Sequence, residues 1–335
     1  MDKRITMRDI TDELGVSVVT VSKALAGKDG VGESLREQIT EKADELGYII
    51  KNEKKIPKPQ NPNIAIVISE RFIYDNAFYF RIYQKMIMEL SEKGFIGILE
   101  IIRKEDEAAG VIPKVIQMNT ANQVVVVGEM KIIFLENLSR TGVNMIFFDF
   151  ENEEFNVDSI ISDNVMGGYT MTRYLVKNGY KNIGFVGNYK ATRNILDRLA
   201  GHLKYKLAKS LVQRDSWLIS DRDEDGRYTE IKLPKDMPEA FLCNCDETAY
   251  NLIKTLENAG YKVPEDIAVV GYDDYASKKV DGVKITTYHV DVDEMIRQCI
   301  HIIGQKSINP GYRRGIVLVH GKLVEGNTVI KYKTD

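Results

Sequence analysis

Two aspartates and one arginine have the positions of ligand-binding residues. In folds of alternating strands and helices, such residues follow the ends of strands or the starts of helices. Asp149 ends the apolar run FFDF, Asp273 ends the run VVGYD, and Arg198 follows the start of an expected helix. Carboxylates and guanidinium forks bind hydroxyl groups, and residues at the carboxyl ends of parallel strands face the ligand crevice. We expect all three to contact a small polar ligand. The alternatives are that the aspartates cap turns and that Arg198 pairs with Asp197.

The sequence offers no recognisable arrangement for catalysis, a metal or a cofactor. Cys243 and Cys245 form a single CxC pair, expected to be reduced and buried, and the four histidines lack ligand spacing. No GxGxxG, P-loop, GxSxG or HExxH motif is present, and no nucleophile lies at a recognisable spacing from a base. Asp163 and Asn164 look catalytic in isolation but are better explained as shaping a strand-to-helix turn. We therefore expect a protein that is not an enzyme.

The first 49 residues have the pattern of three short helices. Thr6 and Ser17 can cap the first two helices, and Gly15 and Gly47 can end the first and the third. The expected helices are MRDITDEL at 7–14, VVTVSKAL at 18–25 and ESLREQITEKADEL at 33–46. A tight turn between the first two would make a helix-turn-helix, whose second helix enters the DNA major groove.

The expected second helix has apolar residues on both faces. Val16, Val21 and Leu25 would pack the turn, whereas Val18 and Val19 point outward, where they could meet thymine methyl groups. Lys23 could donate to a base edge or a phosphate, and four hydroxyl residues could bind phosphate oxygens: Thr6, Ser17, Thr20 and Ser22. The alternative is a helical cap that binds protein or nothing, since residues 1–61 hold eleven Lys/Arg and eleven Asp/Glu.

The rest of the chain divides into a linker and an α/β core. Residues 50–62 are polar and basic and contain three prolines, which disfavour a helix. From residue 63, helical stretches such as 79–94, 167–179 and 247–260 alternate with apolar runs. The runs are NIAIVIS, FIGILEII, NQVVVVG, NMIFFDF, DSIIS, NIGFVG, AFLCN and DIAVVGYD. Such alternation predicts mostly parallel sheets covered on both faces, here in two lobes.

Composition agrees with a cytoplasmic protein. The 335 residues are 44% hydrophobic with a net charge of −3, and only three are cysteine. The charged N-terminal sequence does not resemble a signal peptide, and no run approaches the roughly 18 apolar residues that a membrane helix needs. We expect no membrane partner.

Several segments resemble the lactose-repressor/galactose-repressor (LacI/GalR) family of transcription regulators. The resemblance begins with ITMRDITDELGVSVVTVSKALAGKDGV and a helix ending in ELGY, and it continues through almost the whole chain. The further matching segments are SIISDNVMGGYTMTRYLVKNGYKNIGFVG, DRLAGHLKYKLA, GYKVPEDIAVVGYDD and ITTYHVDVDEM. The resemblance implies an all-α helix-turn-helix headpiece and a two-lobed α/β core like that of periplasmic sugar-binding proteins.

Domain boundaries and partners follow from this resemblance. We expect a headpiece over 1–49, a linker over 50–62 and a core over 63–335. Lobe 1 would comprise about 63–159 and 289–318, and lobe 2 about 160–288 and 319–335. The partners would be double-stranded operator DNA, a sugar-like effector and a second copy of the chain. A sugar-uptake solute-binding protein and an enzyme on the same lobes remain alternatives.

The resemblance also assigns residues. Val18, Val19 and Lys23 occupy base-reading positions, although the family usually has arginine at Lys23. Arg198, Asp273 and Asp149 occupy effector positions, while Cys245 replaces the usual asparagine. A thiol is a poor hydrogen-bond donor, so the effector should not be held as a simple lactose-like sugar is.

Aromatic residues complete the expected effector site. We place Phe78, Tyr79, Phe80, Tyr83, Trp217 and Tyr228 around the cleft, with Phe78 and Tyr228 as ligand contacts. A core position is at least as good an explanation for Phe80 and Tyr83.

The linker departs from the family pattern. It has no leucine and no Ala-Arg-x-Leu motif, and Pro57 and Pro59 disfavour the usual hinge helix. The hypothesis is that this protein binds DNA without a central minor-groove wedge and bends it less.

Overall fold

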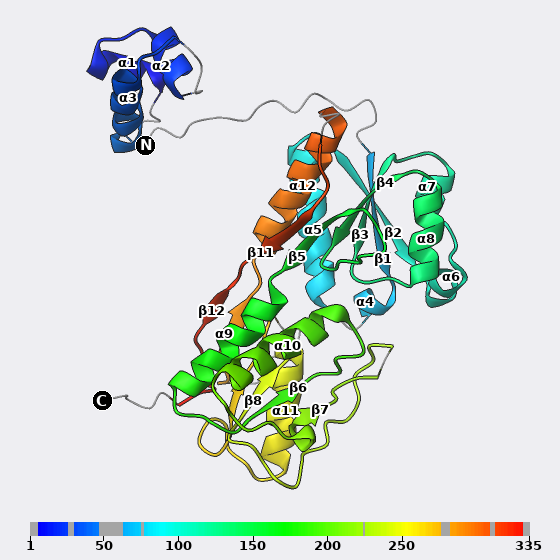
Figure 1. Cartoon of the computed structure of the whole chain (residues 1–335). Helices are drawn as coiled ribbons and strands as arrows, with labels where there is room; N and C mark the ends of the chain where they lie inside the picture. Colours follow the sequence, from blue (N-terminus) through cyan, green and yellow to red (C-terminus); the bar gives the residue numbers. More distant parts are fainter. Residues whose placement is uncertain are drawn as a thin grey trace. The chain divides into compact units, whose positions relative to one another are not determined.

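The computed structural model describes residues 6–25, 30–46, 63–74, 77–223, 225–275, 282–308 and 312–330. The chain forms two compact units, Met1–Pro57 and Lys58–Asp335 (Figure 1). The linker over 50–62, on which the hinge hypothesis rests, and Gly47 lie outside the described residues. Within the described part of the chain, no helix is long and apolar enough to cross a membrane.

The N-terminal unit contains the three predicted helices. They are α1 (Met7–Leu14), α2 (Val18–Leu25) and α3 (Glu33–Glu45). The Asp9 carboxylate accepts hydrogen bonds from the amide and the hydroxyl of Thr6, and Ser17 Oγ accepts one from the Thr20 amide. Gly15 ends α1 at φ 64°, a conformation that favours glycine. The helices bury Ile10, Val21, Ala24, Ile39 and Ala43 between them.

Lobe 1 is a six-stranded sheet between two layers of helices. Its strand order is β11-β5-β4-β3-β1-β2, and every neighbouring pair is parallel. The strands are β1 (Asn63–Ser69), β2 (Ile96–Ile102), β3 (Gln123–Val127), β4 (Asn144–Phe148), β5 (Asp158–Ser162) and β11 (Ile316–Val319). The helices are α4 (Arg71–Tyr74), α5 (Ala77–Glu92), α6 (Lys104–Ala109), α7 (Lys114–Gln117), α8 (Ile132–Arg140) and α12 (Val292–Ile308). Figure 1 shows α5 and α12 on one face of the sheet and α6 to α8 on the other.

Lobe 2 is a four-stranded parallel sheet of order β7-β6-β8-β9. Its strands are β6 (Ile183–Val186), β7 (Leu218–Ile219), β8 (Ala240–Cys243) and β9 (Ala268–Val270). Its helices are α9 (Asn164–Lys177), α10 (Arg193–Ala208), the 3₁₀ turn η1 (Asp215–Trp217) and α11 (Asp246–Asn258). β10 (Thr287–His289) and β12 (Lys322–Val324) form a separate antiparallel pair.

The predicted parallel sheets are confirmed, and all eight predicted apolar runs contain a strand. Four short strands were not predicted: β7, β10, β11 and β12, of two to four residues each. Segments of two or three residues are too short to show a period of two. The exact boundaries of headpiece, linker and lobes stay a prediction.

Candidate functional sites: a cavity between the lobes and the outer face of α2

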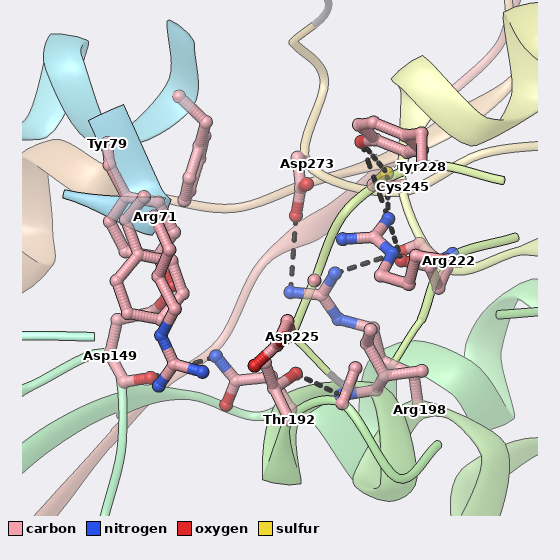
Figure 2. A pocket seen from close by; sticks show the side chains of 17 residues that line it. Arg71, Tyr79, Asp149, Thr192, Arg198, Arg222, Asp225, Tyr228, Cys245 and Asp273 are labelled. Carbon is pink, nitrogen blue, oxygen red and sulfur yellow. Dashed lines mark hydrogen bonds and ion pairs between the residues drawn. The ribbon is translucent and has the colours of Figure 1, made fainter. Parts of the chain in front are cut away.

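A cavity that is partly open to solvent lies between the two lobes. The structure brings all six predicted effector residues to its walls, and Figure 2 labels all of them except Phe78. They are Phe78, Asp149, Arg198, Tyr228, Cys245 and Asp273. Phe78 and Asp149 come from lobe 1 and the other four from lobe 2, so a ligand here would touch both lobes. Their role in binding stays a prediction.

The carboxyl ends of parallel strands position the two aspartates. Asp149 directly follows β4, and Asp273 lies three residues beyond β9. Both have positive φ, 66° and 93°, a region that non-glycine residues rarely adopt. Strained backbone of this kind clusters at functional sites, where the surrounding structure holds it.

Arg198, on α10, is buried at the lobe 2 wall, and each of its three guanidinium nitrogens has a partner. Its Nη2 lies 3.2 Å from Asp273 Oδ1, and its Nε donates to Asn164 Oδ1 at 2.9 Å. Its Nη1 donates to the Asn244 carbonyl at 2.6 Å, and the guanidinium stacks on the Tyr272 ring. Arg198 therefore forms its ion pair with Asp273 and not with Asp197, the alternative partner considered from the sequence.

Asp149 has a perturbed carboxyl. The Tyr79 hydroxyl donates to its Oδ2 at 2.7 Å, and Asn194 Nδ2 donates to its backbone carbonyl at 2.8 Å. Burial raises the pKa of Asp149 to about 6, because the opposing effects of Tyr79 and Arg198 are smaller. The carboxyl can therefore change its charge close to neutral pH.

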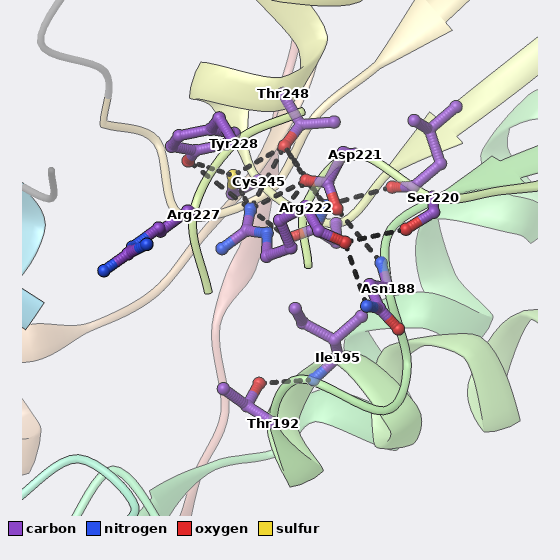
Figure 3. Close-up of polar contacts among 12 residues, drawn as sticks. Asn188, Thr192, Ile195, Ser220, Asp221, Arg222, Arg227, Tyr228, Cys245 and Thr248 are labelled. Carbon is purple, nitrogen blue, oxygen red and sulfur yellow. Dashed lines mark hydrogen bonds and ion pairs between the residues drawn. The ribbon is translucent and has the colours of Figure 1, made fainter. Parts of the chain in front are cut away.

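Arg222 is a cavity residue that the sequence did not reveal. Its Nη2 lies within hydrogen-bond distance of the side-chain oxygens of Asp221, Asn244 and Thr248, and 3.4 Å from Cys245 Sγ (Figure 3). Its guanidinium also lies 4.6 Å from the centre of the Tyr228 ring. Arg222 stands in the charged segment DRDEDGR, which has the composition of a solvated loop. Only the tertiary fold shows that Arg222 and its neighbour Asp221 turn inward.

Cys245 and Tyr228 belong to the same cluster. The Tyr228 hydroxyl and Cys245 Sγ are 3.6 Å apart, and Thr248 Oγ1 is 3.2 Å from the sulfur. Burial raises the pKa of the Cys245 thiol, and the nearby Arg222 charge opposes that rise. Cys243 and Cys245 are both free and buried, as expected. Among the described residues, no group of three His, Cys, Asp or Glu side chains is arranged to hold a metal ion.

Three of the aromatic residues placed around the cleft lie elsewhere. Trp217 is buried inside lobe 2, where its Nε1 donates to the Asp236 carbonyl at 2.8 Å. Phe80 is 46% exposed and Tyr83 is half-buried against it, on a side of α5 away from the cavity. The core explanation for Phe80 is wrong as well, because the helix turns this side chain outward. Tyr79 does line the cavity.

The predicted turn-shaping role is confirmed for Asp163, which lies between β5 and α9. Asp163 caps α9 by accepting a hydrogen bond from the Met166 amide at 2.9 Å. Asn164 is buried and also orients Arg198.

The predicted DNA contacts lie on α2 and, for Thr6 and Ser17, directly before α1 and α2. Val18 is 43% and Val19 is 64% exposed, although Val21 and Ala24 on the opposite face are buried. Ser22 and Lys23 are also exposed, and so are Thr6 and Ser17, while Thr20 is half-buried. An exposed apolar pair beside a lysine suits a base-reading surface. Contact of these residues with DNA stays a prediction.

Two family models match the chain. Residues 6–50 match the bacterial regulatory proteins of the lacI family, and residues 172–329 match the periplasmic binding protein-like domain. The first match covers the described headpiece helices, and the second covers most of lobe 2 and the return through α12.

Curated relatives span nearly the whole chain. An HTH-type transcriptional repressor PurR from Vibrio campbellii (strain ATCC BAA-1116) is 23% identical over 336 residues, covering 97% of this chain and 99% of the relative. PurR from Glaesserella parasuis serovar 5 (strain SH0165) is 25% identical over 294 residues, covering 85% of this chain and 84% of the relative.

Solved structures share the fold. The transcriptional regulator CelR–cellobiose complex aligns with a TM-score of 0.68 at 21% identity, covering 97% of this chain and 100% of that one. The lac repressor dimer bound to operator and the anti-inducer ONPF aligns with a TM-score of 0.65 at 19% identity, covering 98% and 100%. With its helix-turn-helix domain followed by a periplasmic binding protein-like core, the chain belongs to the LacI family of bacterial regulatory proteins.

Proposed function

We propose that this protein represses transcription by binding operator DNA, and that a saccharide or sugar derivative bound between the lobes controls its operator affinity. The observation that carries the proposal is the convergence of six ligand-type side chains from both lobes on one cavity. A ligand that touches both lobes can favour one lobe arrangement over another, which is what a regulatory ligand must do.

The ligand class follows from the charges and rings at the cavity. Arg71, Arg198 and Arg222 face Asp149, Asp225 and Asp273, so cations and carboxylates are balanced in number. Such walls offer both donors and acceptors, as hydroxyl groups require, and the aromatic faces of Phe78 and Tyr228 suit a sugar ring. The structure of CelR was solved with cellobiose, which supports this class.

The DNA partner and the assembly follow from the headpiece. The exposed face of α2 would read bases, with Val18, Val19 and Lys23 at the base edges and hydroxyl residues at the phosphates. A homodimer would bind two half-sites about one helical turn apart, as the dimeric lac repressor on its operator suggests. A regulator of this kind works in the cytoplasm and needs neither membrane nor cofactor.

The proposed domain plan keeps a headpiece over 1–49, a linker over 50–62 and a sensor core over 63–335. The relatives named above are transcriptional regulators. We propose that this protein has no enzymatic activity.

Melting of the purified chain with a panel of saccharides, sugar acids and sugar phosphates tests the effector site. A ligand that binds only the folded protein adds about 2.7 kcal/mol of stability at a hundredfold excess over its Kd. We expect one panel member to raise the melting temperature of the wild type but not of Arg198→Lys. That variant keeps a cation beside Asp273 while losing the guanidinium fork.

The matched control is Arg140→Lys, on the exposed end of α8 and away from the cavity. It should respond to the ligand like the wild type. A panel without any response, or a response that Arg198→Lys retains in full, would contradict a saccharide site at this cavity.

A further inference from the structure

A second cavity adjoins the effector cavity. The two share Arg71, Asp225 and Gly226, and the second adds the side chains of Lys104, Lys131 and Arg227. Four basic side chains therefore meet beside the proposed sugar site. We call Arg71, Lys104, Lys131 and Arg227 the basic collar.

Three successive strand-to-helix turns of lobe 1 supply most of the collar. Arg71 is the first residue of α4, Lys104 is the first residue of α6, and Lys131 directly precedes α8. These turns follow β1, β2 and β3, at the sheet edge where α/β folds bind ligands. Arg227 approaches from lobe 2. The collar is thus built from four separate segments, unlike a charged run on one solvated helix.

Two of the three acids in this cavity are engaged by lobe 1 itself. Glu107 is only 2% exposed and accepts hydrogen bonds from the Ser69 hydroxyl and the Lys131 amide. Glu70 accepts one from the Lys104 amide at 2.8 Å. Both carboxylates therefore serve the turns that carry the collar, and Glu107 also lies 3.7 Å from Arg71 Nη2.

The third acid, Asp225, comes from lobe 2 and occupies the collar. Its Oδ2 lies 2.9 Å from Lys104 Nζ, and Lys104, Arg227 and Lys131 together lower the pKa of the Asp225 carboxyl. Asp225 is 52% exposed, and ion pairs between exposed side chains contribute little to stability. Asp225 shows that a carboxylate fits the collar, and that one can be displaced from it at little cost.

We propose that the basic collar binds an anionic group of the effector, a phosphate or a carboxylate, which takes the place of Asp225. The neutral part of the same molecule then fills the adjoining cavity with Arg198 and Asp149. This inference rests on the proposed function, and it narrows the ligand to an acidic saccharide. A sugar ring and its acidic substituent would lie on either side of Arg71, which lines both cavities.

Calorimetric titration of the full chain with inorganic phosphate and with glucose, glucose 6-phosphate and glucuronate tests the collar. We expect phosphate to bind, and an acidic sugar to bind about tenfold more tightly than glucose, as charge-assisted hydrogen bonds imply. This preference should shrink as salt rises, because the collar is solvent-accessible. The two acidic sugars show whether phosphate or carboxylate is the preferred group.

Variants separate the collar from the sugar site. Lys104→Gln combined with Lys131→Gln should abolish phosphate binding and the preference for acidic sugars, while Asp225→Asn should strengthen both by removing the internal competitor. Lys114→Gln, an exposed lysine at the start of α7 outside both cavities, should change neither.

The outcomes distinguish the two proposals. If neutral saccharides bind as tightly as acidic ones, anion binding by the collar is refuted and the proposed sugar site stands. If phosphate binds through Lys104 and Lys131 but no saccharide binds, the collar is supported and the saccharide class fails. Phosphate that does not bind the wild type, or binds the double variant equally well, overturns the collar.

Discussion

At the scale of single residues, Asp149 links the cavity to pH. In the folded chain the Asp149 carboxyl has a pKa of about 6, whereas an aspartate in an unfolded chain has a pKa of about 3.9. The folded state therefore binds this proton more tightly, and the free energy of unfolding should fall as pH rises from about 4 to about 6, by up to about 3 kcal/mol. Above that range the contribution should be constant.

The substitution Asp149→Asn tests the predicted direction of this pH dependence. Asp246 and Asp273 are buried with raised pKa values and act in the same direction, so the wild type alone cannot isolate Asp149. Urea unfolding at about pH 4.5 and about pH 7 should show a smaller loss of stability in the variant than in the wild type. Equal pH dependence in both would mean that Asp149 titrates normally.

The same residues show what the sequence could reveal. Asp149 and Asp273 were predictable because each ends an apolar strand, and parallel strands end at one sheet edge. Arg222 was not predictable, because its partners Asn244 and Thr248 lie more than twenty residues away along the chain. Trp217 was misplaced because an aromatic side chain fits a sugar cleft and a core equally well.

At the scale of elements, the close packing of α9 against α10 accounts for the glycine at position 201, three residues after Arg198. α9 and α10 pack so closely that a Cβ at Gly201 would lie 2.0 Å from the Val165 carbonyl oxygen. A Cβ at Gly168 would lie equally close to the Arg198 carbonyl oxygen. The glycines thus set the helix separation that places Arg198 at the cavity wall.

Gly201→Ala should separate these helices. We expect a loss of about 3 kcal/mol in the free energy of unfolding, the upper end for overpacked cores, and weaker effector binding through displaced Arg198. Gly315→Ala, where an added Cβ meets nothing within 4 Å, is the matched control and should be nearly neutral. Denaturant unfolding with and without ligand measures both effects. A neutral Gly201→Ala would show that the helices adjust freely.

The two faces of α2 should respond differently to truncation. Val19→Ala, on the exposed face, should weaken binding to a duplex obtained by in vitro selection about fivefold while leaving stability within about 0.5 kcal/mol. Val21→Ala, on the buried face, should instead destabilise the headpiece by about 2 kcal/mol. Fluorescence anisotropy and thermal melting measure the two quantities. A Val19→Ala variant with unchanged DNA affinity would argue against base reading by α2.

Helices and long strands were predictable from periodicity and caps, and the short return strands were not. β11 does carry an apolar run, IVLV, but it follows the crossing α12 and joins β5 at the sheet edge. Its place in lobe 1 depends on a partner more than 150 residues earlier in the chain, which no local pattern shows.

At the scale of the whole molecule, two functions are joined in one chain. The headpiece carries an exposed apolar face on α2, and the core carries a cavity whose walls come from both lobes. The family resemblance in the sequence extends over both units, so their combination was predictable from the residues alone. The second cavity was not predictable, because four separate segments form its basic collar.

The central claim is that a ligand in the cavity changes the affinity of the headpiece for DNA. The most direct test is fluorescence anisotropy of the full chain on its selected duplex, with and without a saturating saccharide that raises its melting temperature. Coupling of 1–3 kcal/mol, typical of allosteric proteins, predicts a change of about 5- to 150-fold in Kd, absent in Arg198→Lys. An identical DNA affinity with the cavity empty and filled would contradict the account.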